Sequence, residues 1–478
     1  MIPTAEQFDL VVVGGGPGGY AAALYAASAG MNVALVEKDA LGGTCLNRGC
    51  IPAKAFLETA AVKRHVEHAA DFGIDAGAPP DSVGVNFAVT QERKQKIVAG
   101  LVGGIAAMCK NRKVTVFNGS GSLGPDKVVS VQLTDGSDSP ELTAPSVILA
   151  SGSVPRLIPG FERGGPIMTS DEVLDLDYVP ASVVVIGGGA IGCEFASTFA
   201  DLGAKVTILE ALPKILPGLD ADVANVVVRS FKKKQIDIHT GVSVTGHSLR
   251  DGGGTTVHFG RDGSADQSLD VDAVIVSVGR RPYADELGLD GTGVKLDDRG
   301  FVVVDEYCRT GEDGVYAVGD LINTPPLAHV GYAEAILCVK QALGEPVVPV
   351  QYDRVPWAIY CHPEVAWSGP GEEAAKEAGL DVVVSKHPFK FNSRAQILGE
   401  TEGLAKIIAE VGRDGRPGRI VGVHMVGPWV TEQLSGGYLA VNWEATVDEV
   451  AEFIQPHPSL TELFGETMMS LTGRNFNG

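Results

Sequence analysis

The stretch FDLVVVGGGPGGYAAALYAASAGMNVALVEK, residues 8–38, predicts a strand, a glycine-rich turn, a helix and a second strand. Its first apolar, β-branched run suits a buried parallel strand. Gly14, Gly16 and Gly19 then form the pattern G-x-G-x-x-G, and the second strand ends at Glu37. In a dinucleotide site these glycines allow a tight turn, close approach of the pyrophosphate and close helix packing, and the acid binds a ribose. The stretch therefore predicts a Rossmann-like unit.

The same pattern occurs again in ASVVVIGGGAIGCEFASTFADLGAKVTILEA, residues 181–211. Gly187, Gly189 and Gly192 form its motif, and its second strand ends at Glu210. The step from first glycine to acid is 23 residues in both units, 37 − 14 and 210 − 187. One such motif is a weak signal, whereas two in full βαβ context are a strong one. We expect two bound dinucleotides; the alternative is a pair of glycine turns in unrelated α/β units.

The acid at the end of each second strand indicates which nicotinamide cofactor is used. A carboxylate there accepts a hydrogen bond from a free 2′-hydroxyl and repels a 2′-phosphate. The segment ALPKILPGLD that follows Glu210 contains Lys214 as its single basic residue. We therefore expect NAD(H) rather than NADP(H).

Composition excludes several classes of partner. The chain has 478 residues, enough for two or three domains, and a formal net charge of −21. Nucleic acids and anionic membranes need basic surface, so neither is an expected partner. The charge-free run 10–36 is long enough to span a membrane, but it holds six glycines and a proline. With no secretory signal in the sequence, we expect a cytoplasmic protein without a membrane span.

Further glycine signals follow the two units. The segments 147–155 and 274–282 each place a turn after an apolar strand, the second containing Gly279, and GVYAVGD ends at Asp320. The last ~130 residues lack the dinucleotide motif and mix strands with helices, with a hairpin turn expected within 410–422. The expected fold class is α/β, with two Rossmann-like dinucleotide-binding domains and a C-terminal α+β domain.

Cys45 and Cys50 stand in GGTCLNRGC, residues 42–50, a glycine-rich loop before an expected helix. A zinc site would need two more ligands, and the other five cysteines are scattered singly, so no metal site is expected. A structural bridge would close a tiny loop and stabilise little, and two inert buried thiols are a further alternative. Pro52 suits the first turn of a helix, which places Cys50 at a helix N-terminus, where a thiol pKa is lowered. A redox-active pair fits best.

The stretch GGTCLNRGCIPAK, residues 42–54, resembles the redox-active disulfide signature of the class I pyridine nucleotide–disulfide oxidoreductases. The two Rossmann-like units, Gly319-Asp320 and QPHPSLTE at 455–462 follow in that family's order, so the resemblance covers nearly the whole chain. Within the family the chain is most similar to the dihydrolipoamide dehydrogenases. That resemblance implies two-electron transfer between a dihydrolipoyl dithiol and NAD through a Cys45–Cys50 disulfide and FAD.

The resemblance also implies the domains and the cofactor contacts. Residues 1–150 and 280–348 would form the FAD-binding domain, 151–279 the NAD-binding domain and 349–478 the dimerisation domain. The residues implied to bind cofactor are Gly14, Gly16, Gly19, Glu37, Lys54, Asp320 and Ala328 for FAD, and Gly187, Gly189, Gly192, Glu194, Glu210 and Gly279 on the NAD side or beside the flavin.

By the same resemblance, Cys50 lies beside the flavin and Cys45 meets the substrate. His457 would reach the other subunit's disulfide as general acid and base, with Glu462 orienting it. Ser459 to Glu462 also reads as a capping box, so Glu462 could cap a helix. Gln455 departs from the family, in which a histidine is usual.

Lys54 sits in the first turn of the expected helix, where the helix dipole disfavours a cation. The resemblance pairs it with Glu194 beside the flavin; the alternative is a solvated lysine.

The implied partners are a second copy of the chain and a lipoyl domain of a 2-oxoacid dehydrogenase or glycine cleavage complex. The sequence leaves two other functions as alternatives. One is an NADH-dependent reductase of another small disulfide or of quinones, and the other is a non-enzymatic flavoprotein scaffold or NAD-sensing subunit.

Overall fold

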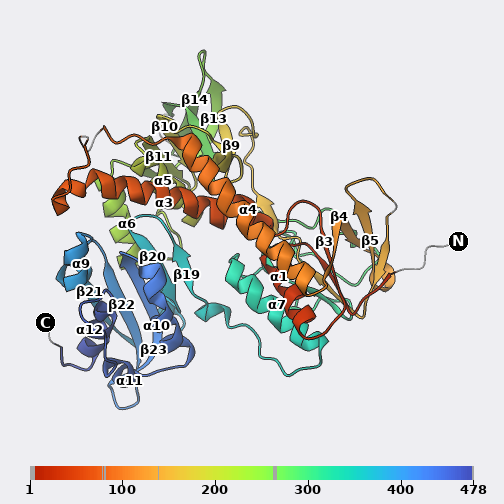
Figure 1. Cartoon of the computed structure of the whole chain (residues 1–478). Coiled ribbons are helices and arrows are strands. Elements are labelled where there is room, and N and C mark those ends of the chain that lie inside the picture. The colour runs from red at the N-terminus through yellow and green to blue at the C-terminus, as the bar shows by residue number, and fades with distance from the viewer. Residues whose placement is uncertain (1–5, 78, 80–81, 138, 262–265, 476–478) are drawn as a thin grey trace.

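The computed structural model describes residues 6–77, 79, 82–137, 139–261 and 266–475. These residues form two α/β units and a C-terminal α+β unit, which confirms the predicted fold class (Figure 1). In the described part of the chain, no helix combines the length and the apolar character needed to cross a membrane.

The first α/β unit is built on an eight-stranded sheet in the order β1-β6-β5-β4-β3-β2-β7-β18. β4, β3, β2, β7 and β18 pair in parallel, while β4, β5 and β6 pair antiparallel. The bounds are β1 (Glu6–Gln7), β2 (Leu10–Val13), β3 (Val33–Glu37), β4 (Thr115–Leu123), β5 (Val128–Leu133), β6 (Glu141–Thr143), β7 (Ser146–Leu149) and β18 (Val315–Ala317). Because β18 follows the second unit in the chain, two distant stretches complete one sheet.

Helices cover this sheet, whose central strands β2 and β3 are buried throughout, as expected for apolar β-branched runs between two helical layers. The helices are α1 (Pro17–Ser28), α2 (Gly43–Arg48), α3 (Cys50–Glu67), α4 (Phe87–Asn111) and α7 (Ala328–Ala342), with short 3₁₀ turns η1 (Ala69–Phe72), η3 (Pro125–Lys127) and η5 (Gly319–Leu321). α1 and α7 run side by side (Figure 1). They approach closely because glycines, Gly18 and Gly331, stand at the contact.

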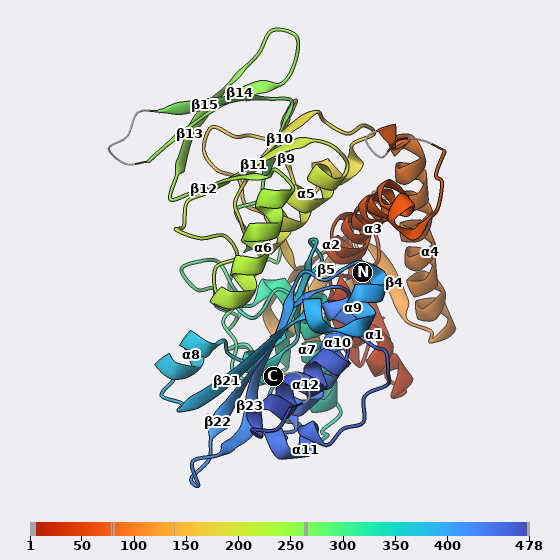
Figure 2. The ribbon, with the colours of Figure 1, turned by 90° about the vertical axis from the view of Figure 1, so that its left-hand side faces the viewer.

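The second α/β unit repeats the arrangement on a five-stranded parallel sheet in the order β12-β11-β10-β16-β9. Its strands are β9 (Ile167–Thr169), β10 (Ser182–Ile186), β11 (Lys205–Glu210), β12 (Asp237–Thr240) and β16 (Ala273–Val276), with helices α5 (Ala190–Asp201), α6 (Ala221–Lys233) and η4 (Glu172–Asp175). An antiparallel sheet of β13 (Ser243–Leu249), β14 (Thr255–Gly260) and β15 (Gln267–Val271) projects from it (Figure 2). β8 (Ser153–Pro155) and β17 (Arg280–Pro282) pair where the chain passes into and out of this unit.

The C-terminal unit is an antiparallel five-stranded sheet in the order β19-β20-β23-β22-β21. Its elements are η6 (Tyr352–Arg354), β19 (Trp357–Ile359), β20 (Glu364–Ser368), α8 (Glu372–Glu377), β21 (Val382–Pro388), η7 (Phe389–Phe391), α9 (Ser393–Leu398), β22 (Leu404–Val411), β23 (Pro417–Gly427), α10 (Val430–Asn442), α11 (Val447–Ala451) and α12 (Glu462–Leu471). The hairpin expected within 410–422 joins β22 to β23. One face of the sheet packs on α10, α11 and α12, and the other faces α6.

Candidate active site

The first glycine motif follows β2 and has the geometry of a dinucleotide turn. Gly14 has φ +105°, and a Cβ on it would collide with the carbonyl oxygen of Ala150. A Cβ on Gly19 would collide with the carbonyl oxygen of Gly14, so only glycine lets α1 pack this close to the strand. A Cβ on Gly16, in contrast, would meet nothing nearer than 3.9 Å. The space beside Gly16, at the N-terminus of α1, is therefore open to a pyrophosphate.

The second motif repeats this geometry before α5. Gly187 also has φ +105°, and its Cβ would collide with the carbonyl oxygen of Ser277. Gly192 packs against Gly187 as Gly19 packs against Gly14, and a Cβ on Gly189 would meet no atom within 4 Å. The two units thus leave the same opening at the same place.

The acids that end the second strands are held in matching ways. Each carboxylate accepts two backbone N–H bonds at 2.5–2.8 Å, from Gly15 and Asp39 for Glu37 and from Gly188 and Leu212 for Glu210. Both side chains are buried, and burial raises the pKa of Glu37. A carboxylate has about four acceptor positions, so two remain for ribose hydroxyls.

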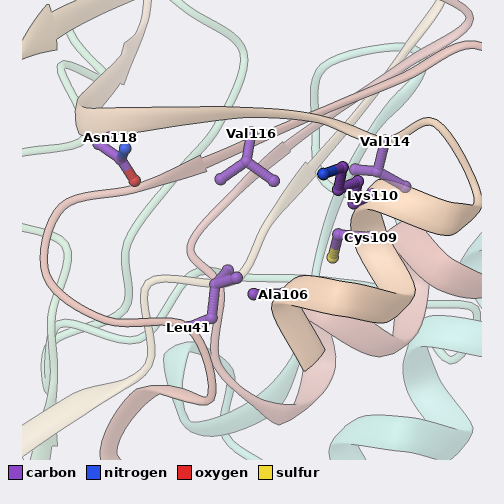
Figure 3. Close-up of a pocket in the computed structure, with 7 residues that line it drawn as sticks. All are labelled: Leu41, Ala106, Cys109, Lys110, Val114, Val116 and Asn118. Carbon is purple, nitrogen blue, oxygen red and sulfur yellow. The ribbon is translucent and has the colours of Figure 1, made fainter. Parts of the chain in front are cut away.

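A cavity of about 370 Å³ lies between α4, β4 and the chain that follows β3 (Figure 3). Asn118, which lines it, pairs directly with Glu37 across the two strands. The lining is mostly apolar and consists of Leu41, Ala106, Cys109, Lys110, Val114, Val116 and Asn118. An apolar slot near a carboxylate with free acceptor positions fits a purine ring whose ribose would meet that carboxylate. Together with the openings beside Gly16 and Gly189, it shows that the residues present fit FAD and NAD.

The two cysteines flank the junction of α2 and α3. Cys50 is the first residue of α3, as the position of Pro52 predicted, whereas Cys45 lies inside the short helix α2 rather than in an irregular loop. The chain turns into α2 through Gly42, whose φ of +97° favours glycine, and burial of Leu46 against the core stabilises that turn of helix. Both cysteines are free thiols, Cys45 half-buried and Cys50 exposed.

The two thiols differ in acidity. A hydrogen bond from the Cys45 thiol is the main cause that lowers the pKa of Cys50 to about 7, and the charge of Lys54 adds to it. The same hydrogen bond and burial raise the pKa of Cys45. A thiolate therefore forms first on Cys50, which stands at a helix N-terminus that favours negative charge.

Lys54 and Glu194, which are 140 residues apart, form a close ion pair. The Lys54 ammonium lies 2.8 and 2.7 Å from the two carboxylate oxygens of Glu194. Sequence reasoning missed Tyr360, which completes the group: its N–H donates to Glu194 at 2.9 Å, and Lys54 lies over its ring at 4.7 Å from the centroid. The ion pair places a fixed cation one helical turn from Cys50.

Asp320, Gly279 and Ala328 lie where the two units meet. Asp320 accepts a hydrogen bond of 2.5 Å from Ser153, and Arg280 donates to the same serine at 2.7 Å. Gly279 has φ +100° and open space on its Cβ side, and Ala328 is the first residue of α7. These three stand at strand ends or helix starts, where backbone groups are free to meet a ligand.

His457 and Glu462 are brought together at the start of α12. His457 Nδ1 lies 2.8 Å from one carboxylate oxygen of Glu462, while the other oxygen accepts the N–H of Ser459 at 2.8 Å. Glu462 thus orients the imidazole and satisfies a backbone donor before the helix. Gln455, the departure from the family pattern, packs against Gly465.

A single chain does not bring His457 to the cysteines. The His457 side chain is 71% exposed, and Figure 2 shows α12 in the lower part of the molecule, with α2 and α3 in the upper part. The thiol pair and the imidazole meet only if a second copy of the chain supplies one of them.

Two tyrosines next to the thiols carried no sequence signal that singled them out. Tyr20 of α1 and Tyr332 of α7 share a hydroxyl hydrogen bond of 2.5 Å. Burial is the main cause that raises the pKa of each, and the charges of Cys45 and Cys50 add to it. The pairing depends on the close contact of α1 and α7, which lie 312 residues apart at this point.

The fold and this site define a dithiol-exchanging dinucleotide enzyme, and comparison with known families gives the same class. Residues 8–335 match the pyridine nucleotide-disulphide oxidoreductase family, and residues 355–468 match its dimerisation domain. The chain belongs to this family. Its cofactors are FAD and NAD, and the protein forms a homodimer.

Curated relatives and solved structures resemble the chain over nearly its whole length. Dihydrolipoyl dehydrogenases of Bacillus subtilis and Trypanosoma brucei brucei are each 38% identical, covering 98% and 99% of this chain and 99% and 98% of the relatives. The crystal structure of LpdA from Mycobacterium tuberculosis has a TM-score of 0.89 at 27% identity, covering 98% of this chain and 99% of the other. The HOCl-induced flavoprotein disulfide reductase RclA from Escherichia coli, as a Cu(II) complex, has a TM-score of 0.85 at 25% identity, covering 97% and 99%.

Proposed function

We propose that this protein is a dihydrolipoyl dehydrogenase, which oxidises a dihydrolipoyl dithiol and reduces NAD⁺. The thiol pair supports this proposal most strongly. Cys50 is acidic, stands next to the Lys54–Glu194 ion pair and follows a unit that fits FAD, while Cys45 is the partner thiol one helix earlier. The names of relatives at 36–38% identity support the same assignment.

The reaction begins with proton removal from the substrate. Neutral His457 of the partner subunit takes the proton of one substrate thiol, and the thiolate attacks Sγ of Cys45 in the oxidised pair, releasing Cys50 as thiolate. The second substrate sulfur, once deprotonated, attacks the first, which closes the substrate disulfide and releases Cys45. FAD would be held by the first glycine motif and Glu37, and when bound it would supply the two-electron acceptor that links the cysteine pair to NAD⁺.

The surrounding charges suit these steps. Glu462 accepts a hydrogen bond from His457 Nδ1, which leaves Nε2 to take the proton and stabilises the charged ring afterwards. Lys54 stabilises the Cys50 thiolate that each exchange releases. Protein dipoles and charges that are already in place cost no reorganisation when charge develops.

Assay of the purified homodimer with FAD bound tests the proposal. Dihydrolipoamide with NAD⁺ should be the best substrate pair in a panel that includes reduced glutathione in the forward direction and oxidised glutathione and quinones with NADH. Faster turnover of another disulfide, or of a quinone by a route that does not need Cys45, would instead assign the protein as an NADH-dependent reductase of that substrate. Absence of any NADH-driven spectral change would favour a non-enzymatic role.

We also propose that the dithiol is carried by a lipoyl domain of a 2-oxoacid dehydrogenase or glycine cleavage complex. In the proposed arrangement the thiol pair of one subunit and His457 of the partner subunit form the site together, at the subunit interface. A dithiol on a long, mobile arm can reach such a site while it stays attached to its own protein. We expect this exchange to take place in the cytoplasm.

Cofactor discrimination is a direct test of the Glu210 site. NADH should exceed NADPH in kcat/KM by at least about 10²-fold, or roughly 2.7 kcal/mol, because the fixed, buried carboxylate repels a 2′-phosphate. Steady-state rates with each nucleotide at fixed lipoamide measure the ratio. Glu210→Gln should lower the ratio, and equal rates in the unaltered protein would contradict the assignment.

Removing the Lys54 cation should make Cys50 a weaker acid. In Lys54→Met the neutral side chain no longer favours the thiolate, so the titration of Cys50 should move upward by about 1 pH unit. Absorbance of the Cys50 thiolate beside the flavin, followed against pH in a Cys45→Ser background, gives the midpoint. Lys54→Arg keeps the charge and serves as the control, and an unchanged midpoint in Lys54→Met would argue against an electrostatic role.

A further inference from the structure

Among the described residues, Lys406 forms a deeply buried ion-pair cluster between two units of the fold. It lies in β22 of the C-terminal unit with 2% of its side chain exposed. Its ammonium lies 2.9 Å from Asp220, 2.8 Å from Asp222 and 2.9 Å from Glu372. Burial opposes the charge, but these carboxylates hold the pKa of Lys406 above its ordinary value. Because two of them begin α6, the cluster joins the C-terminal sheet to the second Rossmann-like unit.

Asp220 links Lys406 to the loop that precedes α6. One of its oxygens caps α6 by accepting the N–H of Asp222 at 3.0 Å, and the other accepts the N–H of Glu372 at 3.1 Å. Asp220 directly follows residues 211–219, the loop that leaves β11. Lys406 therefore contacts the residue at which this loop ends.

The other end of loop 211–219 is attached to the dinucleotide site itself. The N–H of Leu212 donates to Glu210 at 2.7 Å, and the N–H of Leu216 donates to the carbonyl oxygen of Gly188 at 2.8 Å. Ile215 fills the space into which a Cβ on Gly188 would point. The loop thus fixes the ribose-binding carboxylate and packs on the glycine turn.

The loop holds a strained conformation between its two attachments. Leu216 has φ +52°, a left-handed value that a branched residue rarely adopts. Such a residue keeps this conformation only where its surroundings impose it. A firm anchor at Asp220 meets that requirement.

In the first Rossmann-like unit, the corresponding loop is fixed by contacts within the same unit. There the N–H of Gly42 donates to the carbonyl oxygen of Gly15 at 2.8 Å, and Leu41 packs on Gly15. The chain then enters α2 within the same unit, and Gly42 supplies the positive φ at no steric cost. In the second unit the anchor comes from another part of the fold.

We propose that Lys406 is a positioning residue for the adenosine half of NAD(H): through Asp220 it holds loop 211–219, and the loop holds the Glu210 carboxylate. The proposal rests on the assignment of the second unit to NAD(H). It places a determinant of nucleotide affinity in the C-terminal unit, on the sheet face opposite α10, α11 and α12, at a position that touches neither nucleotide nor substrate.

Lys406→Met in the FAD-loaded homodimer tests the proposal. The dissociation constant of NAD⁺, measured by calorimetric titration, should rise about tenfold, as should its KM, while the KM for dihydrolipoamide stays unchanged. Amide hydrogen exchange of the 211–219 peptide should accelerate, and the NADH-to-NADPH preference should fall. Asp220→Asn, which keeps a capping side chain but weakens the ion pair, should shift the same quantities if Lys406→Met fails to fold.

Lys233→Met is the matched control. Lys233 also joins α6 to the C-terminal unit, through Glu402 at 2.8 Å, but its side chain is 71% exposed and lies at the far end of the helix. It should leave NAD⁺ affinity and loop exchange unchanged. Unaltered values in both Lys406→Met and Asp220→Asn, or equal effects from Lys233→Met, would overturn the proposal. Failure of the unaltered protein to bind NAD⁺ would instead contradict the assignment of the second unit.

Discussion

Serine at either Cys45 or Cys50 should lower dihydrolipoamide oxidation by NAD⁺ at least about 10⁴-fold while FAD stays bound, because a hydroxyl cannot form the mixed disulfide or the internal one. The residues proposed to hold the adenosine half of FAD lie on α1, at the end of β3 and along β4, and neither substitution alters them, so flavin content should not change. Stopped assays with dihydrolipoamide and the visible spectrum of the purified variants measure both quantities.

The two variants should also differ from each other. In Cys45→Ser the remaining Cys50 thiol keeps the nearby charge of Lys54, which lowers its pKa, but loses the hydrogen bond from the Cys45 thiol, which is the larger cause. Its thiolate absorbance beside the flavin should therefore be present at alkaline pH and fade as the pH falls. Cys50→Ser should show no such band, because in the proposed arrangement Cys50 is the thiol beside the flavin. Lipoamide activity in either variant close to that of the unaltered enzyme would exclude a redox role for the pair.

His457→Gln should slow dihydrolipoamide oxidation by about 10²–10⁴-fold, the range of general acid–base catalysis, and leave NADH-to-quinone electron flow nearly unchanged. The amide can still accept a hydrogen bond, but it cannot take the proton that the attacking thiol must lose. Glu462→Gln should have a smaller effect, since it weakens the orientation of the imidazole and keeps its proton acceptor. Parallel loss of both activities in His457→Gln would indicate a structural role instead.

Hybrid dimers separate a histidine that acts across the interface from one that acts within its own chain. In a dimer of one Cys45→Ser subunit and one His457→Gln subunit, the second subunit keeps its cysteines and meets the intact His457 of its partner. A verified heterodimer, obtained by reassembling the two inactive proteins, should therefore have about half of the activity of the unaltered dimer. No recovery in verified heterodimers would show that each chain supplies its own imidazole.

The exposed apolar side chains of the C-terminal unit fit this arrangement. Trp443, Phe453 and Ile454 are exposed, and the last two precede the segment that carries His457 by a few residues. Neighbouring large hydrophobic groups are costly to leave in water. In the homodimer a second copy is available to cover such a surface. Trp357 and Trp367, by contrast, stack on each other at 5.3 Å between ring centroids within the sheet.

Much of the site could be read from sequence because it depends on local spacing. Gly19 and Gly192 are each required by a contact a few residues away, with Gly14 and Gly187, and each acid closes its unit 23 residues after the first glycine. Cys50 likewise owes its helix-start position to the neighbouring Pro52. The description of the Cys45 segment as a loop was wrong, since helix α2 depends on the burial of Leu46 in the core as well as on the local glycines.

Other contacts have no local signature. Tyr20 and Tyr332 are 312 residues apart, and Lys406 and Asp220 are 186 residues apart. No spacing along the chain could therefore predict either pair. Resemblance to a family paired Lys54 with Glu194, but the third member, Tyr360, became visible only in the packed structure.

By itself, the sequence determined that two dinucleotide units and a dithiol pair share one chain, because turns, helix starts and strand ends depend on neighbouring residues. The tertiary structure alone decided that Lys406 of the C-terminal unit meets the carboxylate at the start of α6, and it places the helix that follows His457 away from α2 and α3 of its own chain, as the resemblance implied. Both depend on how whole units pack against each other, and the free energy of that packing is summed over surfaces assembled from distant segments.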